Sequence, residues 1–82
     1  MKRITQDEQV QWLLYIDEHV KTKGWPPSTR DIQKEFGISS VSVVSFRMNK
    51  LVGLGYLYRE AGIARAIAIT PDGRMFMEST GE

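Results

Sequence analysis

Cysteine is absent from this chain, and so are several other features that define particular classes of protein. Without cysteine there can be no disulfide and no thiolate metal site, which suits a reducing compartment. No apolar run approaches the roughly 18 residues of a membrane-spanning helix. Lys2 and Arg3 are not followed by the apolar segment of a secretory signal. We therefore expect neither a membrane span nor a cleaved leader.

Side chains for catalysis or metal binding are also sparse. His19 is the single histidine, and neither Asp17 nor Glu18 completes a metal set at helical spacing, so we expect a solvated histidine. The carboxylates resemble exposed helix faces and caps, and no G-x-S-x-G motif is present. A chain of 82 residues leaves little room for a substrate cleft. The sequence predicts no enzyme, no cofactor and no small-molecule substrate.

Net charge is only +1 and the pI is about 8.1. This is low for a nucleic-acid binder, for which a pI above about 9 is common. The charges are unevenly placed, however. Residues 1–37 hold six basic and six acidic side chains, whereas residues 38–74 hold five basic and two acidic. The positive surplus therefore lies in the second half of the chain.

The stretch from Pro26 to Tyr58 carries the strongest local pattern. Ser28 and Asp31 have the spacing of a capping box, and Gly37 is the residue type that ends a helix most easily. Ser39 or Ser40 can then cap a second helix, whose inward face is formed by Val44, Met48 and Leu51. Helices at 29–36 and 40–54 joined by a tight turn form a helix-turn-helix, and the second helix of this motif usually reads the DNA major groove.

A longer helix precedes this motif. Thr5 and Glu8 form a capping box, which predicts a helix from Gln6 to Lys23 that ends at Gly24. Its clearest inward stripe is Leu13, Ile16 and Val20, with further apolar residues around the circumference. These are Val10, Trp12, Leu14 and Tyr15. The excess indicates either a wide buried arc or a second contact, to another copy or to a partner. Trp25 is expected to pack over the junction with the next helix.

After the motif, the runs 56–60 and 66–69 alternate in the manner of strands, and one glycine lies in the loop between them. Thr70 and Pro71 then start a short helix, expected from Asp72 to Ser79, with Met75 and Phe76 facing the core. The fold class is mainly α with a small antiparallel hairpin: a winged helix-turn-helix of three helices, a two-stranded wing and a short C-terminal helix. We expect one domain over 1–82, with a core of 4–79 and a frayed tail at 80–82.

These motifs resemble the N-terminal DNA-binding domain of the LexA repressor family. The segment 24–32 is similar to the family's G-x-P-P-[ST]-x-x-E-I signature, with Asp31 as the acid. Phe36-Gly37-Ile38, the run 51–57 and Arg65-Ala66-Ile67 resemble the end of the family's second helix and its wing. The resemblance covers about residues 3–70 and implies a DNA-binding repressor from a bacterium or a bacterial virus, in the nucleoid-associated cytoplasm.

Two departures from the family qualify this expectation. The family carries a C-terminal self-cleaving and dimerising domain, and the 82 residues end before one, so self-cleavage is not expected. Family members read their operator through the N-terminal half of helix 3. The matching positions here are Ser40, Ser42, Val43, Ser45 and Phe46, which lack the family's charged residues. We therefore do not expect the family's SOS operator as the target.

The candidate DNA-contacting residues come from the start of the first motif helix, the outward face of the second and the wing. They are Ser28, Thr29, Arg30, Ser40, Ser42, Val43, Ser45, Phe46, Arg47, Asn49, Lys50, Arg59 and Arg65. Helix N-termini and basic side chains suit phosphates, whereas serine and apolar side chains can touch base edges. Asn49 suits either an adenine or a phosphate.

Several of these residues have alternative roles. Phe46 could pack beside the hairpin, contact a thymine methyl or mark a protein interface. Arg59 and Arg65 could lie along the DNA backbone and minor groove, or remain solvated with one of them paired to Glu60. The function expected first is a sequence-specific double-stranded DNA-binding regulator. The alternative is a protein-binding winged helix that docks onto a regulator or an enzyme, and a homodimer or protein partner could use helix 1 or Phe46.

Overall fold

The computed structural model describes residues 6–60, 62–63 and 65–80 and confirms a winged helix-turn-helix. The elements in chain order are α1 (Gln6–Lys23), α2 (Thr29–Phe36), α3 (Val41–Gly53), β1 (Leu57–Arg59), β2 (Ile67–Ile69) and α4 (Pro71–Thr80). The strands are shorter than expected and α4 begins one residue earlier, at Pro71. The capping residue proposed for α1, Thr5, and the end of the predicted tail, 81–82, lie outside the described residues.

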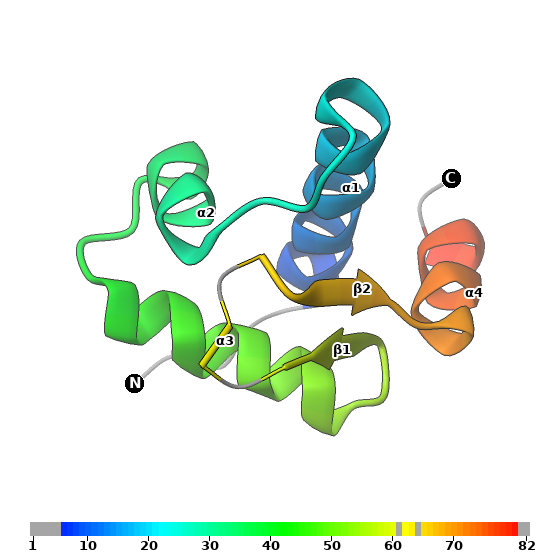
Figure 1. Cartoon of the computed structure of the whole chain (residues 1–82). Helices are drawn as coiled ribbons and strands as arrows, with labels where there is room; N and C mark the ends of the chain where they lie inside the picture. Colours follow the sequence, from blue (N-terminus) through cyan, green and yellow to red (C-terminus); the bar gives the residue numbers. More distant parts are fainter. Residues whose placement is uncertain (1–5, 61, 64, 81–82) are drawn as a thin grey trace.

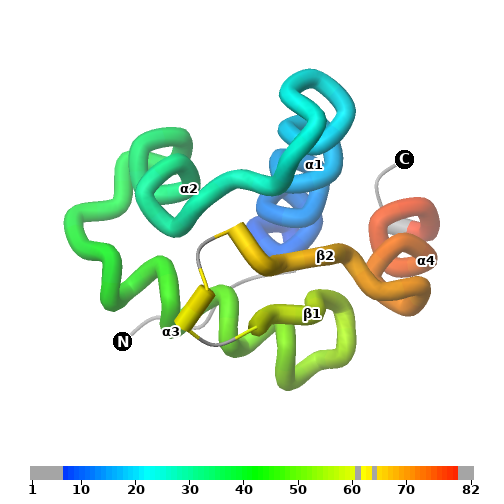
Figure 2. Tube along the Cα trace, viewed as in Figure 1, coloured from blue at the N-terminus to red at the C-terminus, as the bar shows by residue number. Residues whose placement is uncertain are grey.

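The elements surround a single core. Figure 1 shows α2 and α4 on opposite sides of α1, with α3 crossing below them. The chain turns sharply between α2 and α3, as the trace in Figure 2 shows. β1 and β2 pair antiparallel, with Leu57 opposite Ile69 and Arg59 opposite Ile67. β1 packs on α3, while β2 contacts α1 and α4, so the wing is anchored to the helices at its base. No helix among the described residues is long and apolar enough to cross a membrane.

The helix boundaries of the motif follow from local capping. The Ser28 hydroxyl accepts the Asp31 N–H at 3.1 Å, and the Asp31 carboxylate accepts the Ser28 N–H at 3.0 Å. This is the expected capping box. Gly37 ends α2 with φ of +62°, a conformation that glycine adopts without steric cost. Ser40, not Ser39, caps α3, because its hydroxyl accepts the Val43 N–H at 3.2 Å.

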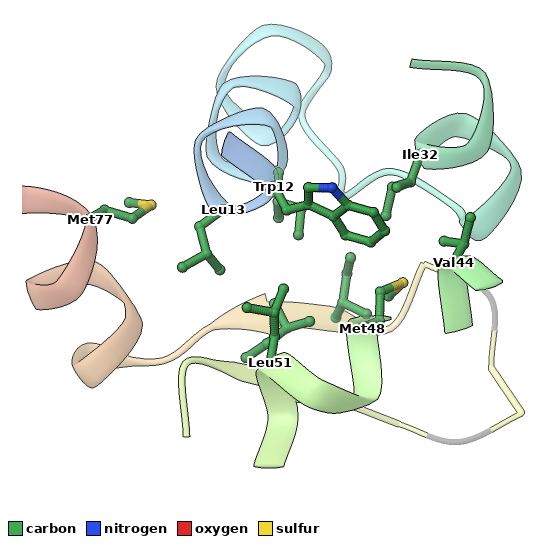
Figure 3. Packing of buried hydrophobic residues seen from close by; sticks show 10 residues of the cluster. Trp12, Leu13, Ile32, Val44, Met48, Leu51 and Met77 are labelled. Atoms are coloured by element: carbon green, nitrogen blue, oxygen red, sulfur yellow. The ribbon is translucent and has the colours of Figure 1, made fainter. Parts of the chain in front are cut away.

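Every element contributes to the core, as Figure 3 shows for part of it. The buried hydrophobic side chains of the helices and strands are Val10, Trp12, Leu13 and Ile16 from α1, Ile32 from α2, Val44, Met48 and Leu51 from α3, Leu57 and Ile67 from the strands, and Met77 from α4. Trp12 stacks on Phe36 with ring centroids 5.3 Å apart, which closes α1 onto α2. Tyr56 stacks on Phe76 at 4.3 Å, which closes the start of the wing onto α4.

The inward face of α1 differs from the expected stripe. Trp12 is buried, whereas Val20 is 41% exposed. The last turn of α1 presents His19 inward instead, three residues after Ile16 and on the same side. The Trp25 ring was expected to cover the junction between α1 and α2, but Trp25 is half exposed. The junction is held instead by the backbone carbonyl of Trp25, which hydrogen bonds to His19. The expected stripe was therefore correct at Leu13 and Ile16 and wrong at Val20.

The inward face of α4 also differs from expectation. Met75 is 68% exposed, Met77 is buried and Phe76 is partly buried. The cause is Gly73, one turn before Met77, which lies against the backbone of Tyr56. A Cβ added at Gly73 would come within 2.1 Å of the Tyr56 carbonyl oxygen. This close approach turns the Gly73 and Met77 side of the helix inward and leaves Met75 outside.

Thr70 joins α4 to the end of α3. Its N–H donates to the Tyr56 carbonyl at 3.1 Å and its hydroxyl to the Gly55 carbonyl at 2.6 Å. The same hydroxyl accepts the Gly73 N–H at 2.9 Å, so Thr70 is the expected N-cap. The short helix is consequently fixed relative to the segment that leaves α3.

Candidate nucleic-acid interface

α3 has an inner and an outer face. Because Val44, Met48 and Leu51 point inward, the opposite side of the helix is left to solvent. The exposed candidate residues there are Ser42, Phe46, Asn49 and Lys50, and the partly buried ones at its margins are Ser40, Val43, Ser45 and Arg47. The structure thus brings the α3 candidates onto one surface, with serines, an apolar ring and an amide near its centre.

One margin of this surface faces the start of α1. The Arg47 guanidinium lies 4.0 Å from the Glu8 carboxylate, and Val43 is partly buried on the same side. Nearer the centre, Phe46 is 43% exposed and the Lys50 ammonium lies 5.4 Å from its ring centroid. That distance suits a cation–π contact. Phe46 therefore offers an apolar face beside a positive charge.

The other margin faces the wing, and Arg59 forms it. Its guanidinium donates to the Asn49 side-chain oxygen at 3.0 Å and to the Ser45 hydroxyl at 3.2 Å. These residues line a shallow groove of about 270 Å³ together with Val52 and Gly62. Within the described part of the chain, Arg59 has neutral partners and no carboxylate. Glu60 is hydrogen bonded to the Tyr58 hydroxyl at 2.5 Å rather than to an arginine.

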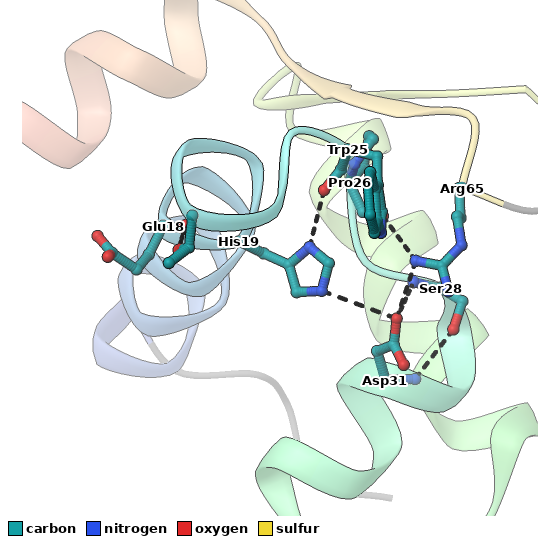
Figure 4. Close-up of polar contacts among 8 residues, drawn as sticks. Glu18, His19, Trp25, Pro26, Ser28, Asp31 and Arg65 are labelled. Atoms are coloured by element: carbon teal, nitrogen blue, oxygen red, sulfur yellow. Dashed lines mark hydrogen bonds and ion pairs between the residues drawn. The ribbon is translucent and has the colours of Figure 1, made fainter.

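Arg65, the other wing arginine, reaches back to the start of α2. Its Nη1 donates to the Pro26 carbonyl and to the Asp31 carboxylate, each at 3.0 Å (Figure 4). Its backbone is left-handed, with φ of +64°, which is uncommon for a residue with a side chain. The hydrogen bond from the Ser28 N–H, followed by the contact with Arg65, holds the pKa of Asp31 below its ordinary value of 3.8. The wing and the α2 N-terminus, which were treated as separate sites, are therefore one connected site.

His19 belongs to the same cluster, which corrects the expectation of a solvated histidine. It is only 9% exposed. Its Nδ1 lies 2.8 Å from the Trp25 carbonyl oxygen and must donate there, because a carbonyl only accepts. Its Nε2 lies 3.8 Å from the Asp31 carboxylate. The sequence signal was its spacing of three residues from Ile16, which places it inward; among the residues that the structure describes, no group of three potential ligands could hold a metal.

The α2 N-terminus presents backbone donors beside this cluster. Ser28 and Thr29 are partly buried, and Arg30 is exposed. The capping box takes the Asp31 N–H, while the N–H groups of Thr29 and Arg30 belong to the first turn and have no acceptor within the helix. A helix start of this kind favours an anion, and Arg30 and Arg65 add positive charge next to Asp31.

A three-helix core, a hairpin packed against the third helix and an exposed outer face on that helix define a winged helix-turn-helix domain. Residues 1–66 match the sequence model of the LexA DNA binding domain. The chain therefore belongs to the LexA DNA-binding domain family. The match includes α1, α2, α3 and β1, whereas β2 and α4 lie beyond it.

Several LexA repressors are similar to this chain. The chain is 44% identical over 55 residues to the LexA repressor of Herpetosiphon aurantiacus, which covers 67% of this chain and 26% of that protein. It is 34% identical over 73 residues to the LexA repressor of Limosilactobacillus reuteri, and the matched segment is 89% of this chain and 35% of that protein. It is 39% identical over 69 residues to the LexA repressor of Enterococcus faecalis, and the matched segment is 84% of this chain and 33% of that protein. The chain thus spans about a third or less of the length of these relatives.

Proposed function

We propose that this chain is a sequence-specific double-stranded DNA-binding transcription regulator that acts as a repressor. One observation carries the proposal: the outer face of α3 is exposed and bordered by basic side chains in a chain that belongs to a DNA-binding family. The similar proteins named LexA repressors support the sign of regulation. We place it in the cytoplasm of a bacterium, or of a cell infected by a bacterial virus, and assign no catalytic activity to these residues.

In this proposal α3 enters the major groove with its outer face toward the bases. Ser40, Ser42 and Ser45 can hydrogen bond to base edges, and Val43 and Phe46 can contact thymine methyl groups. Arg47 lies at the margin away from the wing and Lys50 lies beside Phe46, and both suit phosphates of the groove. Phosphate contacts orient the helix, and the contacts at its centre supply sequence preference.

The connected site formed by α2 and the wing is proposed to hold the DNA backbone. The backbone N–H groups of Thr29 and Arg30, together with the Ser28 hydroxyl and the Arg30 side chain, face a phosphate at the start of α2. Arg65 neutralises Asp31, which would otherwise repel that phosphate. Arg59, whose partners among the described residues are neutral, adds positive charge along the wing, where a narrow minor groove favours arginine.

The exposed apolar side chains favour a second candidate, a protein interface. Leu14 and Val20 lie exposed on α1, and Phe46 is exposed on α3. A monomer that makes a few phosphate contacts binds weakly, and strong specific binding in this class uses two half-sites. A homodimer, or a docked regulator or enzyme, would use these side chains. Light scattering with and without operator DNA separates a dimer of this chain from a monomer.

The proposal is tested by mobility shift on random duplex DNA at two salt concentrations, followed by selection of preferred sites. We expect binding that weakens steeply with salt, because each neutralised phosphate contributes about 0.9 to the slope of log affinity against log salt. We also expect a defined consensus sequence. An absence of binding even at low salt would refute the proposal.

Matched lysines make this test specific. Lys50 lies on the proposed surface, and Lys21 lies on the side of α1 that faces α4, where it pairs with Asp17; both are exposed near the end of a helix. Lys50→Gln should weaken binding to all duplexes alike and lower the salt slope by roughly 1, whereas Lys21→Gln should change neither. Arg30→Gln should weaken binding in the same way as Lys50→Gln. Equal effects of the Lys50 and Lys21 substitutions would indicate binding through net charge alone.

A further inference from the structure

Arg59 fixes the hydrogen-bonding character of two side chains on the outer face of α3. Arginine has five N–H donors and no acceptor. The atom of Asn49 that faces Arg59 at 3.0 Å must therefore be its oxygen, and the NH2 group of Asn49 must point elsewhere. By the same reasoning the Ser45 oxygen accepts from Arg59 at 3.2 Å, and the proton of its hydroxyl is directed away from Arg59.

Ser45 and Asn49 are four residues apart, so they lie one above the other along the wing side of α3. Asn49 is exposed, and both residues line the groove between α3 and the wing. Arg59 occupies one acceptor lone pair on each oxygen and places a cation beside it, while the NH2 group of Asn49 and the hydroxyl proton of Ser45 stay available to a ligand. This edge of the helix therefore presents donors.

We infer that Arg59 is a positioning residue for base recognition and that Asn49, with Ser45, reads guanine. This rests on the proposed function. In the major groove guanine offers two acceptors, N7 and O6, whereas adenine offers one acceptor and one donor. Asparagine reads adenine by accepting and donating at once, and the hydrogen bond with Arg59 turns the Asn49 oxygen toward the wing, away from the position that such a pair needs. An edge rich in donors thus matches guanine and disfavours adenine.

Selection of preferred DNA sites with four proteins tests this inference. The proteins are the unaltered chain, Asn49→Ala, Arg59→Met and Arg59→Lys. The base pair read by residue 49 is the one whose preference disappears in Asn49→Ala. At that base pair we expect the affinity for a site with guanine to exceed the affinity for a site with adenine by roughly 5- to 150-fold. This ratio corresponds to the discrimination of about 1–3 kcal/mol that a good base contact gives. Arg59→Met should lose most of that ratio, because methionine has no N–H donor, and Arg59→Lys should lose part of it, because a single ammonium lacks the rigid two-nitrogen fork that holds Asn49 and Ser45 together.

The double variant Asn49→Ala with Arg59→Met should show the same preference at that base pair as Asn49→Ala alone, since Arg59 acts through Asn49. Arg59→Lys keeps the charge and should keep the salt slope. If Arg59→Met weakens all sequences equally and leaves the guanine preference intact, Arg59 contacts phosphate only and the inference is wrong. A preference for adenine in the unaltered chain also overturns it.

A measurement on the free protein keeps this inference separable from the proposed function. Asn49 is the only asparagine, so labelling with 15N-asparagine gives a single side-chain NH2 signal. Arg59→Met should shift that signal, because it removes the hydrogen bond to the amide oxygen, while Met75→Ala, a change at an exposed side chain on α4, should leave it in place. An unmoved signal refutes the positioning role whether or not DNA binds. Failure of every protein to bind DNA would refute the proposed function instead.

Discussion

Arg65 and Asp31 are 34 residues apart in the sequence, and their side chains meet at 3.0 Å. The contact joins the wing to the first turn of α2, and the same carboxylate completes the capping box with Ser28. Asp31 therefore serves local and long-range structure at once. It also keeps an acidic group beside a proposed phosphate contact, with Arg65 as its counter-charge.

The energy of this contact can be measured by a double-mutant cycle of Arg65→Met and Asp31→Asn in urea denaturation. Asparagine retains an acceptor for the Ser28 N–H, so the cap is mostly preserved. We expect a coupling energy of about 0.5–1 kcal/mol, because both side chains are partly exposed to solvent. A coupling near zero would mean that the ion pair adds nothing measurable, and that the wing is held by its base and by the hydrogen bond from Arg65 to the Pro26 carbonyl.

Stability should fall in acid. The Ser28 N–H and Arg65 lower the pKa of Asp31. Burial acts to raise the pKa of Asp17, but hydrogen bonds from Lys21 and Arg74 outweigh it, and this pKa is lowered too. The unfolded chain therefore binds protons at a higher pH than the folded one. The contribution of Asp17 and Asp31 to stability is complete above the ordinary pKa of 3.8. It is lost as the pH falls through the lower pKa values of the two residues in the folded protein.

Urea midpoints between about pH 6 and pH 2.5 check this dependence. Asp31→Asn should reduce the fall of the urea midpoint at low pH, and adding Asp17→Asn should reduce it further. If the midpoint of the double variant still falls as steeply as that of the unaltered chain, other carboxyl groups cause the loss of stability.

Adjacent leucines in α1 provide a matched pair for the core. Leu13 is fully buried and Leu14 is 47% exposed. Leu13→Ala should destabilise by about 2–5 kcal/mol, enough to unfold much of a small domain. Leu14→Ala should change stability by only about 0.5 kcal/mol. Thermal unfolding followed by circular dichroism distinguishes them, and similar midpoints for both would contradict the placement of α1.

Two helical glycines should respond in opposite directions to alanine. A Cβ at Gly53 meets nothing within 4 Å, so Gly53→Ala should stabilise by about 0.5–1 kcal/mol through helix propensity. A Cβ at Gly73 would lie 2.1 Å from the Tyr56 carbonyl oxygen, so Gly73→Ala must push α4 away and destabilise. The urea midpoints of the two variants give the signs. A neutral Gly73→Ala would show that α4 adjusts at no cost.

The sequence predicted the elements of the fold because each has its own local signal. Ser28, Asp31 and Gly37 specify α2, and the spacing of Val44, Met48 and Leu51 specifies the inner face of α3. Val20 and Met75 were misplaced because helical spacing gives a period but not its exact phase. The phase is set by neighbours far along the chain, such as Tyr56 against Gly73.

The sequence predicted the candidate contact residues, whose role in DNA binding stays a prediction, but it did not predict the network that connects them. Arg59 and Arg65 are alike in sequence, yet one contacts α3 and the other α2. These contacts depend on where the hairpin lies, which no local pattern encodes. The burial of His19 was missed because a polar side chain was assigned to solvent by default, although its spacing from Ile16 pointed inward.

The division of α3 into two faces has an evolutionary consequence. Stability depends on Val44, Met48 and Leu51, whereas Ser42, Phe46 and Asn49 are exposed to solvent. Substitutions on the outer face can therefore accumulate with little cost to the fold. A lineage could move from one target sequence to another through such changes, and a library that randomises only these outer positions would be a practical starting point for engineered regulators.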